Sequence, residues 1–193
     1  MRVHIHSSED HRTTDLLLLF LVVVLSLCGC GRPQRVSLTP QEVEQKVNAT
    51  GIQLVATNWS EAGFMLPIPS RWNVTKADEK SFFANRFSAP TNYILDLSVR
   101  IMPDPSILNV RNPKGSSGLK PVRSTRCEGT VVETSLVSPP DEYCAETTFA
   151  HTATNVVDGV FLLYLMRYPE SQSDIIPELL LQIIRETKRI DPQ

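Results

Sequence analysis

A run of twelve residues, Leu16–Leu27, is apolar at every position except Ser26. As a helix this run would reach only about 18 Å, because each residue adds ~1.5 Å along the axis. The hydrocarbon core of a bilayer is ~30 Å thick, and a helix needs roughly 20 residues to cross it. The run therefore has the length of the apolar part of a signal peptide, and Arg2 and Arg12 supply the positive charge expected before it. The acidic Asp15, directly before the run, is unusual for such a segment.

The apolar run ends in Leu27-Cys28-Gly29-Cys30, which resembles the lipobox of bacterial lipoproteins. Leu27 and Gly29 match that motif, whereas Cys28 stands where Ala or Ser is more common. The resemblance implies that residues 1–29 are a lipoprotein signal peptide and that Cys30 carries the lipid. Two or more acyl chains would hold the protein stably on a membrane. An ordinary secretory signal or a short uncleaved anchor are the alternatives.

The residue that follows the lipidated cysteine of a bacterial lipoprotein predicts in which membrane the protein is retained. In bacteria with two membranes, the lipoprotein sorting rule retains proteins at the inner membrane when Asp follows the lipidated cysteine. Here that position is Gly31. The resemblance therefore implies the cell envelope, and the periplasmic face of the outer membrane where a second membrane exists.

The bulk properties describe one ordinary globular domain after the export segment. The chain has 193 residues and a formal net charge of −2, and no basic patch indicates nucleic acid as a partner. Residues 30–38 are polar and contain a proline, so we expect a tether. Residues 39–193 have the length of a single domain with a core of its own.

The segment 39–51 is predicted to be a short helix. Thr39 can cap its start, Pro40 suits the first helical position, and Glu42 completes a capping box. Gly51 is expected to end the helix, because glycine readily adopts the left-handed conformation that follows a helix.

Period-two alternation indicates the strands. In the segment 92–102, five apolar side chains alternate with a mixed set, which is typical of a half-exposed strand. Val160–Met166 is apolar on both faces and is expected at the centre of a sheet. The other expected strands are Ile52–Ala56, Phe64–Pro69, Phe82–Phe87, Thr130–Val137 and Tyr143–Thr154.

A long exposed loop is expected from Pro103 to Pro121, and a final helix from about Ser173 to Ile190. The apolar residues of this helix recur at intervals of three and four, forming a stripe that a sheet must cover. These elements predict an α+β fold. Its mostly antiparallel sheet would have about six strands and would pack with an N-terminal and a long C-terminal helix.

The stretch Phe64-Met-Leu-Pro-Ile-Pro-Ser-Arg-Trp72 resembles the F-x-L-P-x-G-W opening of the PsbP-like superfamily, which includes the DcrB-like bacterial lipoproteins. The resemblance covers most of Phe64–Ile190, since members continue with meander strands and close with a helix. Arg71 stands where the family has glycine. The resemblance implies a domain of mostly non-catalytic function and assigns no site residue.

His151 is the histidine that would remain after signal cleavage, since His4, His6 and His11 precede the apolar run. A catalytic triad or a zinc site needs further partners at defined geometry. The sequence has no G-x-S-x-G, His-x-x-x-His or Cys-x-x-Cys motif. It therefore predicts no catalytic residue, no metal site and no cofactor. A small hydrolase that uses His151 with a nearby Asp or Ser is an alternative.

Cys127 and Cys144 are the cysteines left beyond the export segment, and an exported pair favours a disulfide. A simple hairpin of Thr130–Val137 with Tyr143–Thr154 would separate them by roughly 26 Å at strand spacing. Bridged Cα atoms lie within about 7 Å of each other. A disulfide thus requires the chain to fold back before Thr130 or a less simple hairpin, and free thiols are the alternative.

These observations predict a lipid-anchored envelope protein that acts as a non-catalytic binding or accessory module. Its partners would be the membrane, through the anchor, and a protein of the envelope, to which the loop 103–121 could be presented. A carrier of a small apolar ligand is an alternative. It would require a cavity of roughly 300 Å³ or more between the sheet and the helix.

Overall fold

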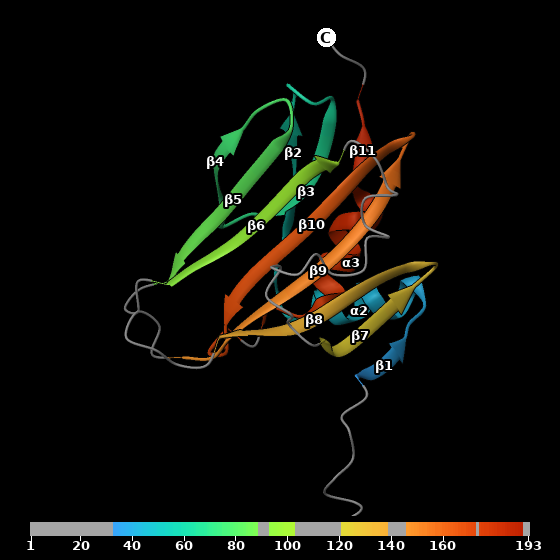
Figure 1. Ribbon diagram of the computed structural model, residues 1–193, viewed down its shortest axis with the longest axis vertical. Helices are drawn as coiled ribbons and strands as arrows, with labels where there is room; N and C mark the ends of the chain where they lie inside the picture. The colour runs from blue at the N-terminus through green and yellow to red at the C-terminus, as the bar shows by residue number, and fades with distance from the viewer. Residues whose placement is uncertain (1–32, 89–92, 103–120, 139–145, 173, 191–193) are drawn as a thin grey trace, which may run out of the picture. The chain divides into compact units, whose positions relative to one another are not determined.

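Eight strands form one twisted sheet, and both helices lie against the same face of it (Figure 1). The computed structural model describes residues 33–88, 93–102, 121–138, 146–172 and 174–190. Neighbouring strands of this large sheet are antiparallel, except for the parallel pair at one edge, β1 with β7. In spatial order the strands are β1 (Gln34–Ser37), β7 (Pro121–Cys127), β8 (Thr130–Ser138), β9 (Thr148–Val157), β10 (Val160–Pro169), β6 (Tyr93–Met102), β5 (Ser81–Ser88) and β4 (Asn73–Ala77).

A second, three-stranded antiparallel sheet has the order β11 (Lys188–Arg189), β3 (Phe64–Pro69) and β2 (Leu54–Trp59). The short β11 pairs only with the first two residues of β3. The prolines of β3, Pro67 and Pro69, therefore have a strand partner on the β2 side alone, which suits residues that lack a backbone donor. Trp59 packs against Phe64 and Phe82, with ring centroids 5.8 Å apart in both pairs, and so joins the small sheet to the large one.

The core lies between the large sheet on one side and the helices and small sheet on the other. Alternate residues of β6 point into it, and Leu95, Leu97 and Val99 are fully buried. The predicted half-exposed strand is thereby confirmed. The apolar strand β10 lies between β9 and β6 in the middle of the large sheet, as its sequence predicts.

The first helix, α2 (Pro40–Ala49), begins as the sequence predicts. The Thr39 backbone N–H donates to Glu42 Oε2 at 2.7 Å, and the Glu42 N–H donates to Thr39 Oγ1 at 3.3 Å. This reciprocal pair satisfies two backbone donors that the first turn leaves free. Gly51 follows the helix with a φ of +72°, which glycine adopts without strain.

The expected α+β fold with about six strands is wrong. The described residues form eleven strands in two sheets and only two helices of ten residues each, so the protein is mostly β. The last helix, α3 (Pro177–Glu186), is shorter than predicted, because Thr187 is extended and β11 follows it. Strands β1, β4, β7 and β11 are rich in polar residues and carry little apolar alternation, so the sequence pattern did not reveal them.

The large sheet also includes residues that we expected in the tether. Gln34–Ser37 form the edge strand β1, and the Leu38 N–H continues the pairing by donating to the Arg126 carbonyl at 2.8 Å. The lipobox with Cys30, the loop residues 103–120 and Cys144 lie outside the described residues. Within the described ranges, no helix is both long and apolar enough to cross a membrane.

Candidate binding cavity

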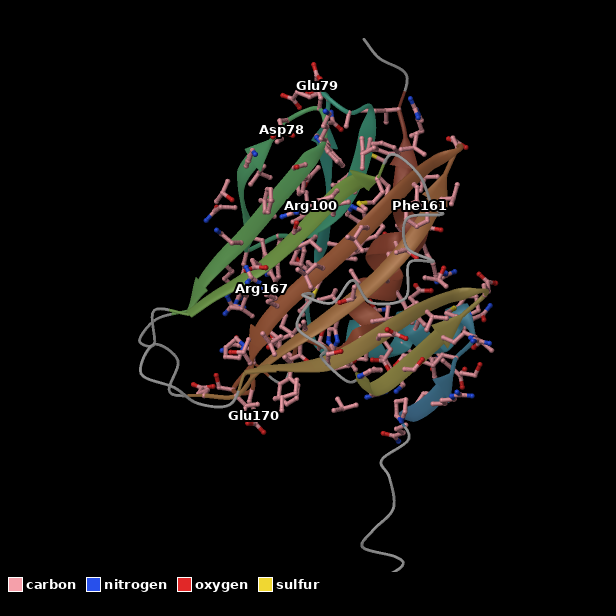
Figure 2. All side chains as sticks on the ribbon, in the orientation of Figure 1. Asp78, Glu79, Arg100, Phe161, Arg167 and Glu170 are labelled. Carbon is pink, nitrogen blue, oxygen red and sulfur yellow. The ribbon has the colours of Figure 1, made fainter. Side chains whose placement is uncertain are left out.

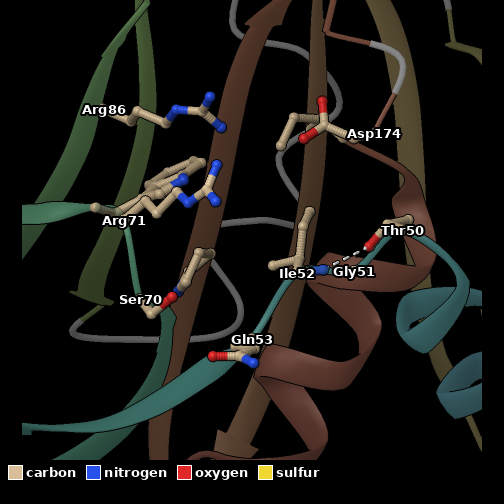
Figure 3. Close-up of a pocket in the computed structure, with 11 residues that line it drawn as sticks. Thr50, Gly51, Ile52, Gln53, Ser70, Arg71, Arg86 and Asp174 are labelled. Atoms are coloured by element: carbon tan, nitrogen blue, oxygen red, sulfur yellow. Dashed lines mark hydrogen bonds between the residues drawn. The ribbon is translucent and has the colours of Figure 1, made fainter.

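A cavity of about 320 Å³ lies where three connecting segments meet beside the inner face of the large sheet (Figure 3). These segments are the α2–β2 connection, the β3–β4 turn and the residues just before α3. Strand β5 contributes one further side chain. The lining residues are Thr50, Gly51, Ile52, Gln53, Pro69, Ser70, Arg71, Trp72, Arg86, Asp174 and Ile175.

Backbone hydrogen bonds hold the first two segments together. The Ser70 N–H donates to the Gln53 carbonyl at 2.8 Å, and the Trp72 N–H closes a turn onto the Pro69 carbonyl at 2.9 Å. Thr50 Oγ1 donates to the Val47 carbonyl at 2.6 Å and accepts from the Ile52 N–H at 3.2 Å. Hydrogen bonds therefore connect the rim of the cavity to both α2 and the small sheet.

Two arginines line this cavity, and Figure 3 shows both side chains on the side opposite Asp174. Arg86 occupies an inward-facing position of β5, two residues after the buried Ala84 and four residues after the buried Phe82. Arg71 projects from the β3–β4 turn, beside the buried Trp72. Within the described structure neither arginine forms an ion pair or a hydrogen bond with another side chain. Two like charges thus line one cavity, and neither has an ion-pair partner among the described residues.

Asp174 faces the two arginines from the other side of the cavity (Figure 3). Guanidinium groups bind carboxylate and phosphate oxygens through paired, charge-assisted hydrogen bonds. A carboxylate such as that of Asp174 accepts hydrogen bonds from hydroxyl or ammonium groups. The arrangement therefore fits a small polar ligand with an anionic group at one end and a hydrogen-bond donor at the other.

Sequence reasoning did not identify this cavity. The sequence marks Arg71 only as the residue in place of the glycine of the PsbP-like motif, and no motif includes Arg86 or Asp174. One feature of the sequence does point to Arg86. It follows the buried Phe82 and Ala84 at the same spacing of two residues, so it lies on the inward-facing side of the strand. An arginine at an inward-facing strand position needs either a buried partner or an opening in the core.

His151 occupies a different place, on β9 between the large sheet and α3, and is fully buried. Its Nδ1 lies 3.0 Å from Thr134 Oγ1, and Tyr168 packs beside its ring. Burial lowers the pKa of His151 to about 3, with a smaller contribution from Arg123 in the same direction and an opposing one from the Ile175 backbone. The ring therefore stays neutral and closed to solvent at neutral pH. This position does not meet the condition for the hydrolase alternative, which needs His151 in an open pocket beside a nucleophile.

Of the remaining predicted site residues, the structure describes only Cys127. Cys127 is buried at the end of β7 and has no disulfide partner among the described residues. Cys144 lies outside those residues, so the disulfide stays a prediction. The lipid on Cys30 also stays a prediction. Among the described residues, no group of three or more His, Cys, Asp or Glu side chains could hold a metal ion.

No protein-family model and no curated protein matches this chain. The PsbP-like resemblance therefore remains a prediction. Among solved structures, a protein of Bacteroides thetaiotaomicron VPI-5482 is 13% identical with a TM-score of 0.44. That alignment covers 72% of this chain and 48% of the other, so the chain spans about half the length of that protein.

A second solved structure is that of LpqN, involved in cell envelope biogenesis of Mycobacterium tuberculosis. It is 12% identical with a TM-score of 0.42, and the alignment covers 80% of this chain and 99% of LpqN. Similarity at this level assigns no function to this chain.

Proposed function

We propose that this chain is a lipid-anchored protein of the cell envelope that acts as a non-catalytic binding module. Cys30 carries the anchor, and the cavity of Arg71, Arg86 and Asp174 takes a small anionic ligand or the anionic end of an envelope partner. The observation that carries the proposal is the pair of arginines that share one cavity, neither with an ion-pair partner among the described residues. A folded domain gains little stability from two unpaired cations that line the same cavity, so a bound anion is their natural complement.

The properties of this cavity argue against the alternative function, which is that of a carrier for a small apolar ligand. The cavity volume lies at the lower end of the ~300–1,000 Å³ range of ligand pockets. Its walls, however, carry two guanidinium groups and a carboxylate. An apolar ligand would strip water from these charges without replacing their hydrogen bonds, which is costly.

Calorimetric titration of the purified full chain tests the ligand site. Suitable probes are N-acetylglycine, inorganic phosphate and glucose 6-phosphate, with glucose as the neutral control. We expect an anionic probe to bind and glucose not to bind. The double variant Arg71→Gln/Arg86→Gln should weaken binding about tenfold or more, because a hydrogen bond to a charged group contributes ~1.5–3 kcal/mol.

The matched control is Arg100→Gln/Arg126→Gln, which removes the same charge from exposed positions outside the cavity. It should leave the affinity nearly unchanged. Equal loss in both double variants would mean that general charge, not the cavity, attracts the probe. Absence of binding by every anionic probe would contradict the proposed ligand site.

The anchor has a test of its own. Intact mass of the protein extracted from bacterial membranes should correspond to a chain that starts at Cys30 and carries diacylglyceryl and acyl groups. A chain cut elsewhere and free of lipid would contradict the anchor while leaving the cavity proposal standing.

A further inference from the structure

Strand β2 is an edge strand of the small sheet, since within the described structure it pairs with β3 alone. The Ser70 N–H donates to the Gln53 carbonyl at 2.8 Å, so these two residues form a hydrogen-bonded pair of the antiparallel ladder. Such pairs alternate with pairs that do not bond to each other. The register therefore directs the backbone N–H and C=O groups of Leu54, Ala56 and Asn58 away from β3, toward the free edge.

The opposite side of β3 has the complementary alternation. The Ile190 N–H donates to the Gly63 carbonyl at 3.0 Å on the β11 side. By the same alternation, the backbone groups of Met65, Pro67 and Pro69 face β11, so the prolines remove no donor from the ladder with β2. Among the described residues, no hydrogen bond reaches the outward groups of β2.

The free edge of β2 also lacks the features that usually protect an edge strand from pairing with another chain. Those features are charged side chains, prolines and bulges. The sequence of β2 is Leu-Val-Ala-Thr-Asn-Trp, and its register with β3 is unbroken. Strand β4, at an edge of the large sheet, has a register shift between Val74 and Lys76 and carries the lysine. Val55 of β2 is 51% exposed, so a partner strand would find apolar surface as well as unpaired backbone groups.

This free edge leads into the cavity. Gln53, the residue directly before β2, lines the cavity together with Arg71 and Arg86 (Figure 3). A strand that pairs antiparallel with β2 runs from the Trp59 end toward the Gln53 end. The C-terminus of such a strand therefore arrives beside the two arginines, and guanidinium groups bind carboxylates through charge-assisted hydrogen bonds.

Charge favours this direction over the reverse one. The β4–β5 turn lies beside the other end of β2, because Trp59 Nε1 donates to the Asp78 carbonyl, and Figure 2 shows Asp78 in this turn. Lys76 is already paired with Asp78 at 2.8 Å, and the Arg189 guanidinium lies over the Phe64 ring. The other charged residues of the two turns at this end are Glu61, Glu79 and Lys80. Mixed charges of this kind attract a carboxylate less than two unpaired guanidinium groups in a cavity.

We propose that β2 and the cavity together bind the C-terminal end of an extended polypeptide. The proposal rests on the anion-binding cavity of the proposed function and names the class of its ligand. The last residues of the ligand pair antiparallel with β2 through the outward backbone groups of Leu54, Ala56 and Asn58. The terminal carboxylate contacts Arg71 and Arg86. Backbone pairing of this kind accepts many sequences, and the carboxylate restricts binding to the free end of a chain.

Calorimetric titration of the purified full chain with a peptide series tests this proposal. The probe is the hexapeptide acetyl-Ser-Thr-Val-Ser-Thr-Val with a free C-terminus. We expect it to bind about tenfold more tightly than its C-terminal amide, which lacks the charge, and than N-acetylglycine, which lacks the strand. Methylation of single backbone nitrogens should weaken binding about fivefold at every second residue, because alternate N–H groups of the ligand face β2. The intervening residues are the matched controls.

The variant Ala56→Pro tests the edge from the side of the protein. It removes one outward N–H and places a ring at the free edge, whereas the ladder with β3 uses the neighbouring residues. We expect peptide binding to weaken about tenfold and the affinity for N-acetylglycine to stay the same. Urea unfolding checks that the variant is folded, and the methylated peptides test the same pairing on the unchanged protein.

The outcomes separate this proposal from the cavity itself. If the peptide acid binds no more tightly than N-acetylglycine, or if methylation has the same effect at every residue, β2 does not pair with the ligand. If the acid and the amide bind equally, the carboxylate does not reach the arginines. Either result overturns the inference and leaves the cavity as a site for small anions. If neither the peptide nor N-acetylglycine, inorganic phosphate or glucose 6-phosphate binds, the cavity of the proposed function fails as well.

Discussion

Thr134 Oγ1 and His151 Nδ1 lie 3.0 Å apart on neighbouring strands, both buried under α3. Arg123 belongs to the same row, since Arg123 pairs with Thr134 and Thr134 pairs with His151. Within the described structure, His151 Nε2 and Arg123 Nε have no hydrogen-bond partner. The inner face of the sheet is therefore polar along this row from β7 to β9, and it becomes apolar where the row continues through Met166 of β10 and Leu97 of β6. A buried neutral imidazole in such a place makes the fold sensitive to acid.

The first prediction concerns that sensitivity. Burial lowers the pKa of His151 in the folded protein to about 3, far below the ordinary histidine value of 6.5. Between these two pH values the unfolded chain binds a proton that the folded protein does not, so stability falls as the pH drops from about 6.5 toward 3. The loss approaches ~1.4 kcal/mol per pH unit for this one group. Urea unfolding at a series of pH values measures it.

The variant His151→Phe/Thr134→Val isolates this contribution, because it removes both hydrogen-bonding partners together and leaves neither unpaired. Its free energy of unfolding should change less than that of the wild type over the same pH range. The single variant Thr134→Val keeps the histidine and should retain the wild-type slope. Identical slopes in the wild type and the double variant would show that His151 is not the buried group that titrates.

The second prediction concerns Glu178, which is 2% exposed in the first turn of α3. Its Oε1 accepts hydrogen bonds from Lys46 Nζ of α2 and Arg123 Nη2 of β7, both at 3.1 Å. Glu178→Gln would leave the partly buried Arg123 without an anion, so we expect a loss of about 2–4 kcal/mol of unfolding free energy. Denaturant unfolding at neutral pH measures it.

Lys46→Met is the comparison for that prediction. Lys46 is 47% exposed, and Arg123 would still neutralise Glu178, so the expected loss is under about 1 kcal/mol. Equal losses in the two variants would mean that the buried carboxylate does not join α2, β7 and α3 as the geometry indicates.

Local signals explain which elements the sequence could predict. The α2 start depends on contacts within one turn, between Thr39 and Glu42, and needs no other part of the chain. β6 and β10 carry their own apolar patterns. β7, in contrast, has the sequence Pro-Val-Arg-Ser-Thr-Arg-Cys, and its strand state depends on pairing with β8 and β1. The apolar residues near the C-terminus recur at helical spacing up to Ile190, and this pattern likewise could not show that Lys188–Arg189 would form β11 and pair with β3.

The sequence alone could not predict the cavity, for a related reason. Arg71, Arg86 and Asp174 are separated by up to about a hundred positions in the chain and meet only because three connections converge. No spacing rule joins such residues. Cys30 is the opposite case, since the stretch Leu27–Cys30 that resembles a lipobox is contiguous in the sequence, and the prediction of a lipid there does not depend on the fold.

The third prediction concerns the β7–β8 hairpin, whose two turn residues both have positive φ, +45° at Glu128 and +87° at Gly129. A two-residue turn of this kind favours Asn-Gly, because asparagine tolerates the left-handed conformation better than glutamate. Glu128→Asn should therefore raise the free energy of unfolding by roughly 0.5–1 kcal/mol. Glu133→Asn, at an exposed strand position, should give no gain in the same urea titration. A gain at position 133 and none at 128 would contradict the turn assignment.

The fourth prediction concerns the thiol of Cys127. The residue is 1% exposed where β7 turns into β8, and burial raises its pKa, so both access and thiolate formation are disfavoured. With no reductant present, iodoacetamide should leave Cys127 unmodified in the native protein and alkylate it once urea has unfolded the chain. Peptide mapping by mass spectrometry identifies the modified position. If Cys127 reacts in urea only after a reductant is added, it is held in a disulfide, and Cys144 is the partner to look for in the unreduced peptides. If it reacts readily in the native protein, the end of the hairpin is more open than the structure shows.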